Sequence, residues 1–107
     1  MLTPQLKTLL QTLQRELAKT LGNDLDEVVL YGSRARGDAR PDSDIDVLIV
    51  VKGELPDLAL RERTLEITAR LSLEYDVVIS RMFTSRARYH TTQSPFFINV
   101  RREGVPL

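Results

Sequence analysis

The chain has 107 residues, of which 42% are hydrophobic and 28% charged, and it contains one histidine and no cysteine. This length predicts a single domain, residues 1–107, with enough apolar residues for a core of its own. The cysteine count excludes disulfides and thiolate metal sites, and the lone histidine excludes a multi-histidine zinc centre. No apolar stretch has the length of a membrane span and no secretory segment opens the chain. We therefore expect a cytoplasmic protein without a membrane partner.

The charges are balanced overall but unevenly distributed. The formal net charge is zero. Residues 38–76 hold ten acids and five bases, a local net charge of −5, whereas residues 81–107 hold five arginines and one acid, a local net charge of +4. An acidic centre suits metal binding, and a basic end can face an acidic partner, phosphates or solvent. The neutral total argues against nucleic acid as a direct partner.

The first half of the chain predicts one long helix and two strands. Thr3 and Pro4 are typical of a helix N-cap and first position, and leucines follow at helical spacing, so this helix ends at about residue 21. Residues 27–31 and 45–51 are short β-branched runs and are predicted to be strands. The second run is almost wholly apolar and is expected at the centre of a sheet. Residues 34–36 are expected to form one helical turn between them.

The second half predicts two helices around a third strand. Helix-forming residues dominate the segment from Leu58 to about Leu73, and residues 75–80 form a short β-branched run. Thr84 can cap a short helix, and Ser94 with Pro95 starts a final helix that stops at a glycine. The order helix, strand, strand, helix, strand, helix predicts an α/β (α+β) fold with a small mixed sheet flanked by helices.

The most informative motif is Gly32-Ser33, then ten intervening residues, then Asp44-Ile45-Asp46. A Gly-Ser turn that leaves a strand can cradle phosphate oxygens with backbone N–H groups and a hydroxyl. Two carboxylates at i and i+2 of the next strand point to one face, where they repel each other until a divalent cation binds. The combination favours nucleotide chemistry with Mg²⁺. The alternative is a polar loop with Ser33 as an N-cap and an aspartate-rich strand edge.

Further candidates surround this motif. Two metal ions need more oxygen ligands than two carboxylates supply, and Asp76 at the start of the third predicted strand is the natural third acid. Its alternatives are an ordinary turn acid, or Glu74 in its place. Arg34 and Arg36 flank the Gly-Ser corner and can contact a triphosphate or remain solvated loop residues.

Three further side chains could have functional roles but are expected to be structural or surface residues. His90 follows Tyr89 and is expected to be a surface or tail histidine rather than a catalytic base. Phe96 and Phe97 lie in the last predicted helix and are expected to be core anchors rather than a platform for base stacking.

The segments 30–37 and 43–47 resemble the polymerase-β-like nucleotidyltransferase superfamily. Within it, the chain resembles the minimal nucleotidyltransferases, the small antitoxin partners of HEPN toxins, and residues 94–105 resemble the tail of those proteins. The resemblance implies ATP as substrate and two Mg²⁺ ions. One ion would steady the leaving pyrophosphate and the other would lower the pKa of the attacking hydroxyl.

The resemblance also distributes roles among the candidates. Asp44, Asp46 and Asp76 would be the catalytic and metal-binding acids, and Asp76 could accept the hydroxyl proton. Gly32 and Ser33 would hold the phosphates, with Arg34 and Arg36 as further nucleotide-binding residues (their alternative as solvated loop arginines stays open).

The resemblance implies an antitoxin that transfers AMP from ATP to a tyrosine of a HEPN RNase toxin and so silences it, within a hetero-oligomer. A chain this short has no second domain to hold an acceptor, which agrees with a macromolecular partner that completes the site. Two alternatives stay open. The chain could modify a small molecule after completing an acceptor pocket with another chain, or it could neutralise the toxin by occlusion without catalysis.

Overall fold

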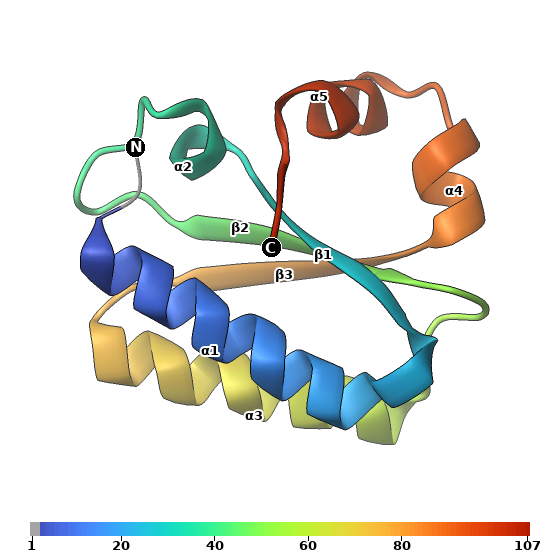
Figure 1. Ribbon diagram of the computed structural model, residues 1–107, viewed down its shortest axis with the longest axis horizontal. Coiled ribbons are helices and arrows are strands. Elements are labelled where there is room, and N and C mark those ends of the chain that lie inside the picture. The colour runs from blue at the N-terminus through green and yellow to red at the C-terminus, as the bar shows by residue number, and fades with distance from the viewer. Residues whose placement is uncertain (1–2) are drawn as a thin grey trace.

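The computed structural model describes residues 3–107 and contains a four-stranded sheet with helices on both faces (Figure 1). The chain order begins with α1 (Pro4–Leu21), a short 3₁₀ turn η1 (Gly22–Asp24), β1 (Leu25–Tyr31), α2 (Ser33–Arg36) and β2 (Ile45–Val51). It continues with α3 (Leu58–Tyr75), β3 (Ile79–Ser85), α4 (Arg86–Thr91), α5 (Pro95–Glu103) and β4 (Val105–Pro106). The predicted α/β fold with a small mixed sheet is confirmed.

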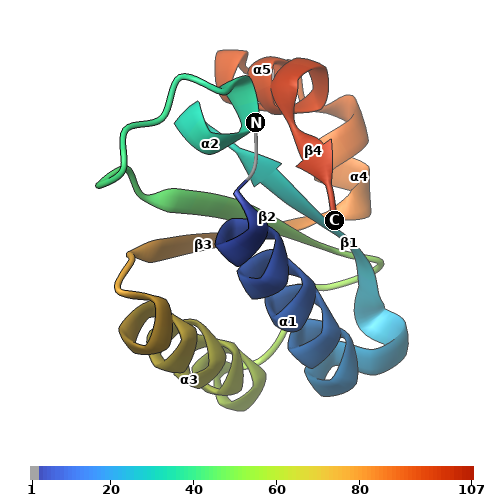
Figure 2. The ribbon, with the colours of Figure 1, turned by 60° about the vertical axis from the view of Figure 1, so that its left-hand side comes forward.

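The sheet has the strand order β3-β2-β1-β4. β2 runs parallel to β3 and antiparallel to β1, and β4 adds two residues at the far edge, antiparallel to β1. Helices α1 and α3 lie together on one face, whereas α2, α4 and α5 lie on the opposite side (Figure 2). Because α3 carries the chain from β2 back to the start of β3, these two strands can be parallel neighbours.

The two faces of the sheet carry separate apolar clusters because β-strand side chains alternate in direction. The larger cluster joins the α1 leucines to one face of β1 and β2, and the smaller one lies under α4 and α5. The smaller cluster consists of Val29, Leu48, Val50, Tyr89, Phe97 and Val100. Every β2 residue except Asp46 is buried. The prediction that residues 45–51 form a central, almost wholly apolar strand is therefore confirmed.

Several element ends follow directly from local chemistry and agree with the sequence. The Thr3 hydroxyl accepts the N–H of Leu6 at 3.1 Å at the start of α1. The Ser94 hydroxyl accepts the N–H of Phe97 at 3.3 Å at the start of α5. The helical turn predicted after Ser33 is α2. These caps supply acceptors for N–H groups that a helix cannot satisfy internally.

The third strand differs from its prediction. We expected residues 75–80, but α3 continues through Tyr75 and β3 spans Ile79–Ser85. Asp76 ends the helix in the left-handed conformation, with φ 52°, and its backbone N–H binds the Ser72 carbonyl. Helical bonding thus continues to the N–H of Val77, which also binds the Ser72 carbonyl, and the strand begins at Ile79, where pairing with β2 becomes available. The short helix is also capped one residue later than expected, by Ser85 instead of Thr84.

None of the helices among residues 3–107 is long and apolar enough to cross a membrane.

Candidate active site

The site is built where β1 ends beside the beginning of β2. Tyr31, the last residue of β1, pairs with Asp46 across the antiparallel ladder, so their side chains share one face of the sheet. Gly32 then turns the chain with φ 76°, and its carbonyl accepts the N–H groups of Ala35 and Arg36, each at 3.1 Å. Ser33 follows as the first, partly buried residue of α2.

Gly32 is required here for space as well as conformation. A β-carbon at this position would overlap the carboxylate oxygen Oδ2 of Asp46. A positive φ is also a conformation that side chains with a β-carbon rarely adopt. The glycine therefore lets the backbone of the Gly-Ser turn approach the carboxylate of Asp46 closely.

Asp44 and Asp46 present their carboxylates near each other. Asp44 is exposed just before β2, whereas Asp46 is partly buried within the strand. The buried Ile45 between them donates its N–H to the Val78 carbonyl at 2.8 Å, which fixes the beginning of β2 against the segment before β3. Burial raises the pKa of Asp46, the negative charge of Asp44 raises it further, and the positive charge of Arg36 opposes the shift. Oxygen ligands and concentrated negative charge are what Mg²⁺ prefers.

Asp76 lies outside β3, in the exposed position that ends α3. The β3 residue level with Asp46 is Ser80. Asp76 instead lines a shallow hollow of about 200 Å³ with Ser43, the residue before Asp44. Among residues 3–107, the carboxylates of Asp44, Asp46 and Asp76 do not converge into a group with mutual distances within 4.8 Å.

Arg34 has a structural task that the sequence did not reveal. Its Nη2 donates to the carbonyls of Ser43 at 2.8 Å and Pro41 at 3.2 Å. The Ser43 hydroxyl in turn accepts the N–H of Arg40 at 2.9 Å. Arg34 therefore ties α2 to the loop that delivers Asp44. This role depends on contacts between Arg34 and residues seven and nine positions later, which no motif in the sequence predicts.

Arg36 lies on the other side of the same turn. Its side chain is 45% exposed and pairs with Asp38 at 3.3 Å and with Glu103 of α5 at 3.7 Å. Its charge also acts on Asp46. Arg36 therefore stands between the acidic pair and the last helix, with a guanidinium that an anionic ligand can reach.

A pocket of about 200 Å³ opens between the Gly32 turn and α5. It is lined by Tyr31, Gly32, Arg36, Phe96, Asn99, Val100 and Glu103. Phe97 is buried in the core as expected, but Phe96 is only partly buried and faces this pocket. Asn99 and Glu103 are not predicted by any motif of the sequence. Their spacing of four residues places them on one side of α5.

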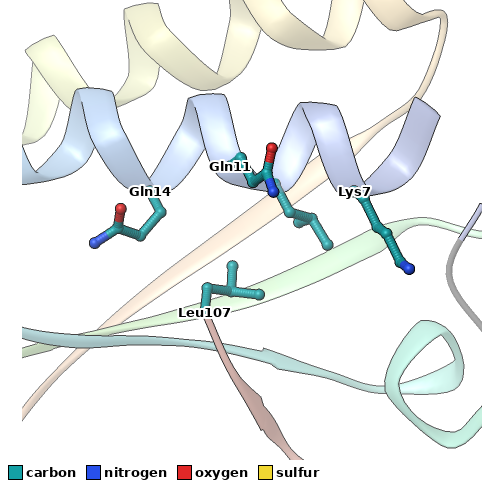
Figure 3. Close-up of a pocket in the computed structure, with 5 residues that line it drawn as sticks. Lys7, Gln11, Gln14 and Leu107 are labelled. Atoms are coloured by element: carbon teal, nitrogen blue, oxygen red, sulfur yellow. The ribbon is translucent and has the colours of Figure 1, made fainter. Parts of the chain in front are cut away.

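Two other features lie away from the acidic pair. Asp26, Glu27 and His90 bring ligand atoms within 4.8 Å of one another, but Asp26 is held by Arg86 at 2.5 Å, and Leu25 beside it pairs with the far end of β2. A second hollow lies between α1 and Leu107, and its lining includes Lys7, Gln11 and Gln14 (Figure 3). None of the side chains that line this hollow is a carboxylate.

Comparisons with known proteins agree with this geometry. A family model described as a nucleotidyltransferase domain matches residues 8–100. Two proteins of Methanocaldococcus jannaschii, each named "Putative protein adenylyltransferase", are similar to the chain. The first is 36% identical over 97 residues, 91% of this chain and 93% of the relative. The second is 32% identical over 81 residues, 75% of each protein.

Solved structures are similar as well. One named as a "putative minimal nucleotidyltransferase" has a TM-score of 0.61 at 26% identity and covers 94% of each chain. A toxin-antitoxin crystal structure with AMP-PNP has a TM-score of 0.58 at 20% identity, covering 87% of this chain and 70% of that one. At 20% identity, the likeness to the toxin-antitoxin structure shows a shared fold.

The resemblance to minimal nucleotidyltransferases noted in the sequence is confirmed. Within the matched residues, the Gly32 turn lies against the carboxylate of Asp46. Because the family model covers most of the chain, the chain belongs to the nucleotidyltransferase domain family.

Proposed function

We propose that this chain is an Mg²⁺-dependent protein adenylyltransferase antitoxin, which transfers AMP from ATP to a tyrosine of a HEPN RNase toxin and thereby neutralises it. The observation that carries the proposal is the contact between the Gly32 turn and Asp46, with Asp44 beside it. The relatives named as protein adenylyltransferases support the reaction class. The toxin-antitoxin neighbours support the kind of partner.

The residues present fit a divalent cation. Asp44 and Asp46 offer carboxylate oxygens as ligands. Burial and, to a lesser degree, the negative charge of Asp44 raise the pKa of Asp46, and a bound cation would favour the ionised carboxylate against both effects. Bound Mg²⁺ would neutralise the triphosphate and favour ionisation of the acceptor hydroxyl. Asp76 is proposed as the third acid, and its place in one hollow with Ser43, next to Asp44, supports that assignment.

The remaining residues position the nucleotide. The backbone at Gly32 and the Ser33 hydroxyl would hold phosphate oxygens, and the guanidinium of Arg36 is exposed enough to join them. In the reaction, an acceptor hydroxyl oxygen forms a bond to the α-phosphorus while the bond to pyrophosphate breaks. The hydroxyl proton passes to a carboxylate, proposed to be Asp76. Catalysis would therefore depend mainly on positioning and charge neutralisation.

The exposed setting of the acids favours a macromolecular acceptor. Asp44 and Asp76 are exposed, and residues 3–107 contain no further helical domain over them. A toxin docked at this edge would supply the missing wall and present its tyrosine to the nucleotide.

The test uses ATP labelled at the α-phosphate, the purified toxin and Mg²⁺. Label is expected on the toxin with the wild-type chain and is expected to be lost with Asp44→Asn. The loop variant Glu54→Gln is the matched control, because Glu54 is exposed in the loop after β2, and it is expected to retain labelling. Absence of label on an active toxin, with all proteins folded, would reject the proposed reaction. If Asp44→Asn still neutralised the toxin fully, neutralisation by occlusion would replace it.

A further inference from the structure

Gly32 and Arg36, which are proposed above to hold phosphates, also line the pocket between the Gly32 turn and α5. Phe96 and Asn99 on the α5 side of this pocket have no role in the reaction described above. We propose that this pocket binds the purine base of the nucleotide, with Phe96 as the stacking surface and Asn99 as a hydrogen-bond donor. The inference rests on the proposed function, because it concerns the nucleotide held at the same site.

The position of the pocket follows from the strand register. Tyr31 lies directly across from Asp46 in the sheet and also lines the pocket. Gly32 contacts both regions, because its α-carbon faces the Asp46 carboxylate and its backbone forms part of the pocket wall. A nucleotide with its phosphates at the Gly32 turn therefore has this pocket within reach of its other end.

The size of the pocket suits a base rather than a whole nucleotide. Its volume is about 200 Å³, whereas pockets that enclose complete drug-sized ligands measure about 300–1,000 Å³. A site of this size can accept one flat ring system and leave the ribose and phosphates outside, toward Asp44 and Asp46.

The walls of the pocket are aromatic on one side. Phe96 and Tyr31 form an edge-to-face pair with ring centroids 5.4 Å apart, and both rings are only partly buried. Phe96 is also supported from behind by the buried Phe97, at a centroid distance of 5.3 Å. A ring held rigidly and left partly open can stack on a nucleobase, as aromatic residues do in nucleic-acid-binding proteins.

The face of α5 that carries Phe96 continues with polar residues that offer both kinds of hydrogen-bonding group. The side-chain oxygen of Asn99 accepts a hydrogen bond from Arg102 at 3.0 Å, so its amide NH₂ group is oriented as a donor. The Glu103 carboxylate is an acceptor and is balanced by Arg36 at 3.7 Å and Arg102 at 3.3 Å. The edge of a purine offers ring nitrogens as acceptors beside exocyclic groups, which matches this arrangement.

The test compares binding of ATP with binding of inorganic tripolyphosphate, which has the phosphates but lacks the base, by calorimetry in the presence of Mg²⁺. Wild-type protein is expected to bind ATP more tightly than tripolyphosphate. Phe96→Ala and Asn99→Ala are each expected to weaken ATP binding at least about fivefold and leave tripolyphosphate binding unchanged. Ile98→Ala is the matched control, because Ile98 is 40% exposed on the same helix and does not line the pocket.

The outcomes separate the two proposals. Suppose that the wild type binds both ligands equally, or that the variants retain the full preference for ATP. The proposal that the pocket binds the purine base is then wrong, whereas the proposed phosphate site at the Gly32 turn is unaffected. If the wild type binds neither ligand, the proposed nucleotide site is wrong, and the proposal of a base-binding pocket is rejected as well. Asn99 is exposed, so Asn99→Ala keeps the test valid even if loss of the Phe96 ring unfolds α5.

Discussion

Gly32 and Asp46 lie against each other at the junction of β1 and β2, so closely that the glycine has no room for a side chain. In the sequence they are separated by α2 and the loop that follows it. The register between β1 and β2 nevertheless brings them together. This contact connects the proposed phosphate-binding turn with the proposed metal-binding acid.

Gly32→Ala is expected to lower the free energy of unfolding by about 1–3 kcal/mol and to abolish nucleotide binding. The added methyl group would overlap the Asp46 carboxylate, and φ of 76° would be strained for alanine. Chemical denaturation measures the first effect and calorimetry the second. Gly53→Ala is the matched control, because nothing lies within 4 Å of a β-carbon there. Equal behaviour of the two variants would contradict the close contact.

Mg²⁺ is expected to stabilise the wild-type chain through Asp44 and Asp46. A ligand that binds only the folded state adds about 2.7 kcal/mol at a concentration 100 times its dissociation constant. Thermal unfolding with increasing Mg²⁺ should therefore show a rising midpoint. Asp46→Asn should remove this dependence, and without Mg²⁺ it should be at least as stable as the wild type because it removes a disfavoured charge. If the unfolding midpoint of the wild type does not change with Mg²⁺ concentration, Asp44 and Asp46 are not Mg²⁺ ligands.

Arg34→Ala is expected to loosen the loop that delivers Asp44. The variant loses the hydrogen bonds to the carbonyls of Pro41 and Ser43, so destabilisation of about 1–2 kcal/mol is expected. Limited proteolysis should then cut within residues 37–44 faster than in the wild type. Arg40→Ala is the comparison, because the Ser43 hydroxyl binds the backbone N–H of Arg40 and not its side chain. If both variants are cut at the wild-type rate, Arg34 does not tether the loop.

The ion pair between Asp26 and Arg86 predicts a pH dependence of stability. The hydrogen bond from Arg86 lowers the pKa of Asp26, with its positive charge acting in the same direction. The ionised carboxylate therefore stabilises the fold fully above its unfolded pKa of about 3.9, and the benefit is lost as the pH falls through the lower folded value.

A double-mutant cycle with Asp26→Asn and Arg86→Gln measures this contribution. Coupling between the two substitutions should be present at pH 7 and should disappear in strongly acidic solution. Coupling that persists unchanged in strongly acidic solution, where the Asp26 carboxylate is protonated in both states, would show that the interaction does not depend on the charge of Asp26.

Much of the fold could be predicted from local sequence signals. Thr3, Ser94 and the apolar run 45–51 act within a few residues, so capping and periodicity located α1, α5 and β2. The third strand was misplaced because Asp76 adopts a left-handed conformation that extends helical bonding, and β3 then depends on pairing with β2. β4 was missed because two residues carry no periodicity, and only the edge of β1 makes them a strand.

The candidate site divides in the same way. Gly32 and Asp46 could be singled out because their residue types and spacing carry chemical meaning. The tether made by Arg34 and the pocket lined by Asn99 depend on tertiary contacts, which no short motif encodes.

The most direct test of the account is the intact mass of the toxin co-expressed with this chain. The wild-type chain is expected to increase the mass of the toxin in steps of one AMP, whereas the double variant Asp44→Asn/Asp46→Asn is expected to leave it unchanged. An unmodified toxin that still co-purifies with the wild-type chain and is neutralised by it would contradict adenylylation as the function.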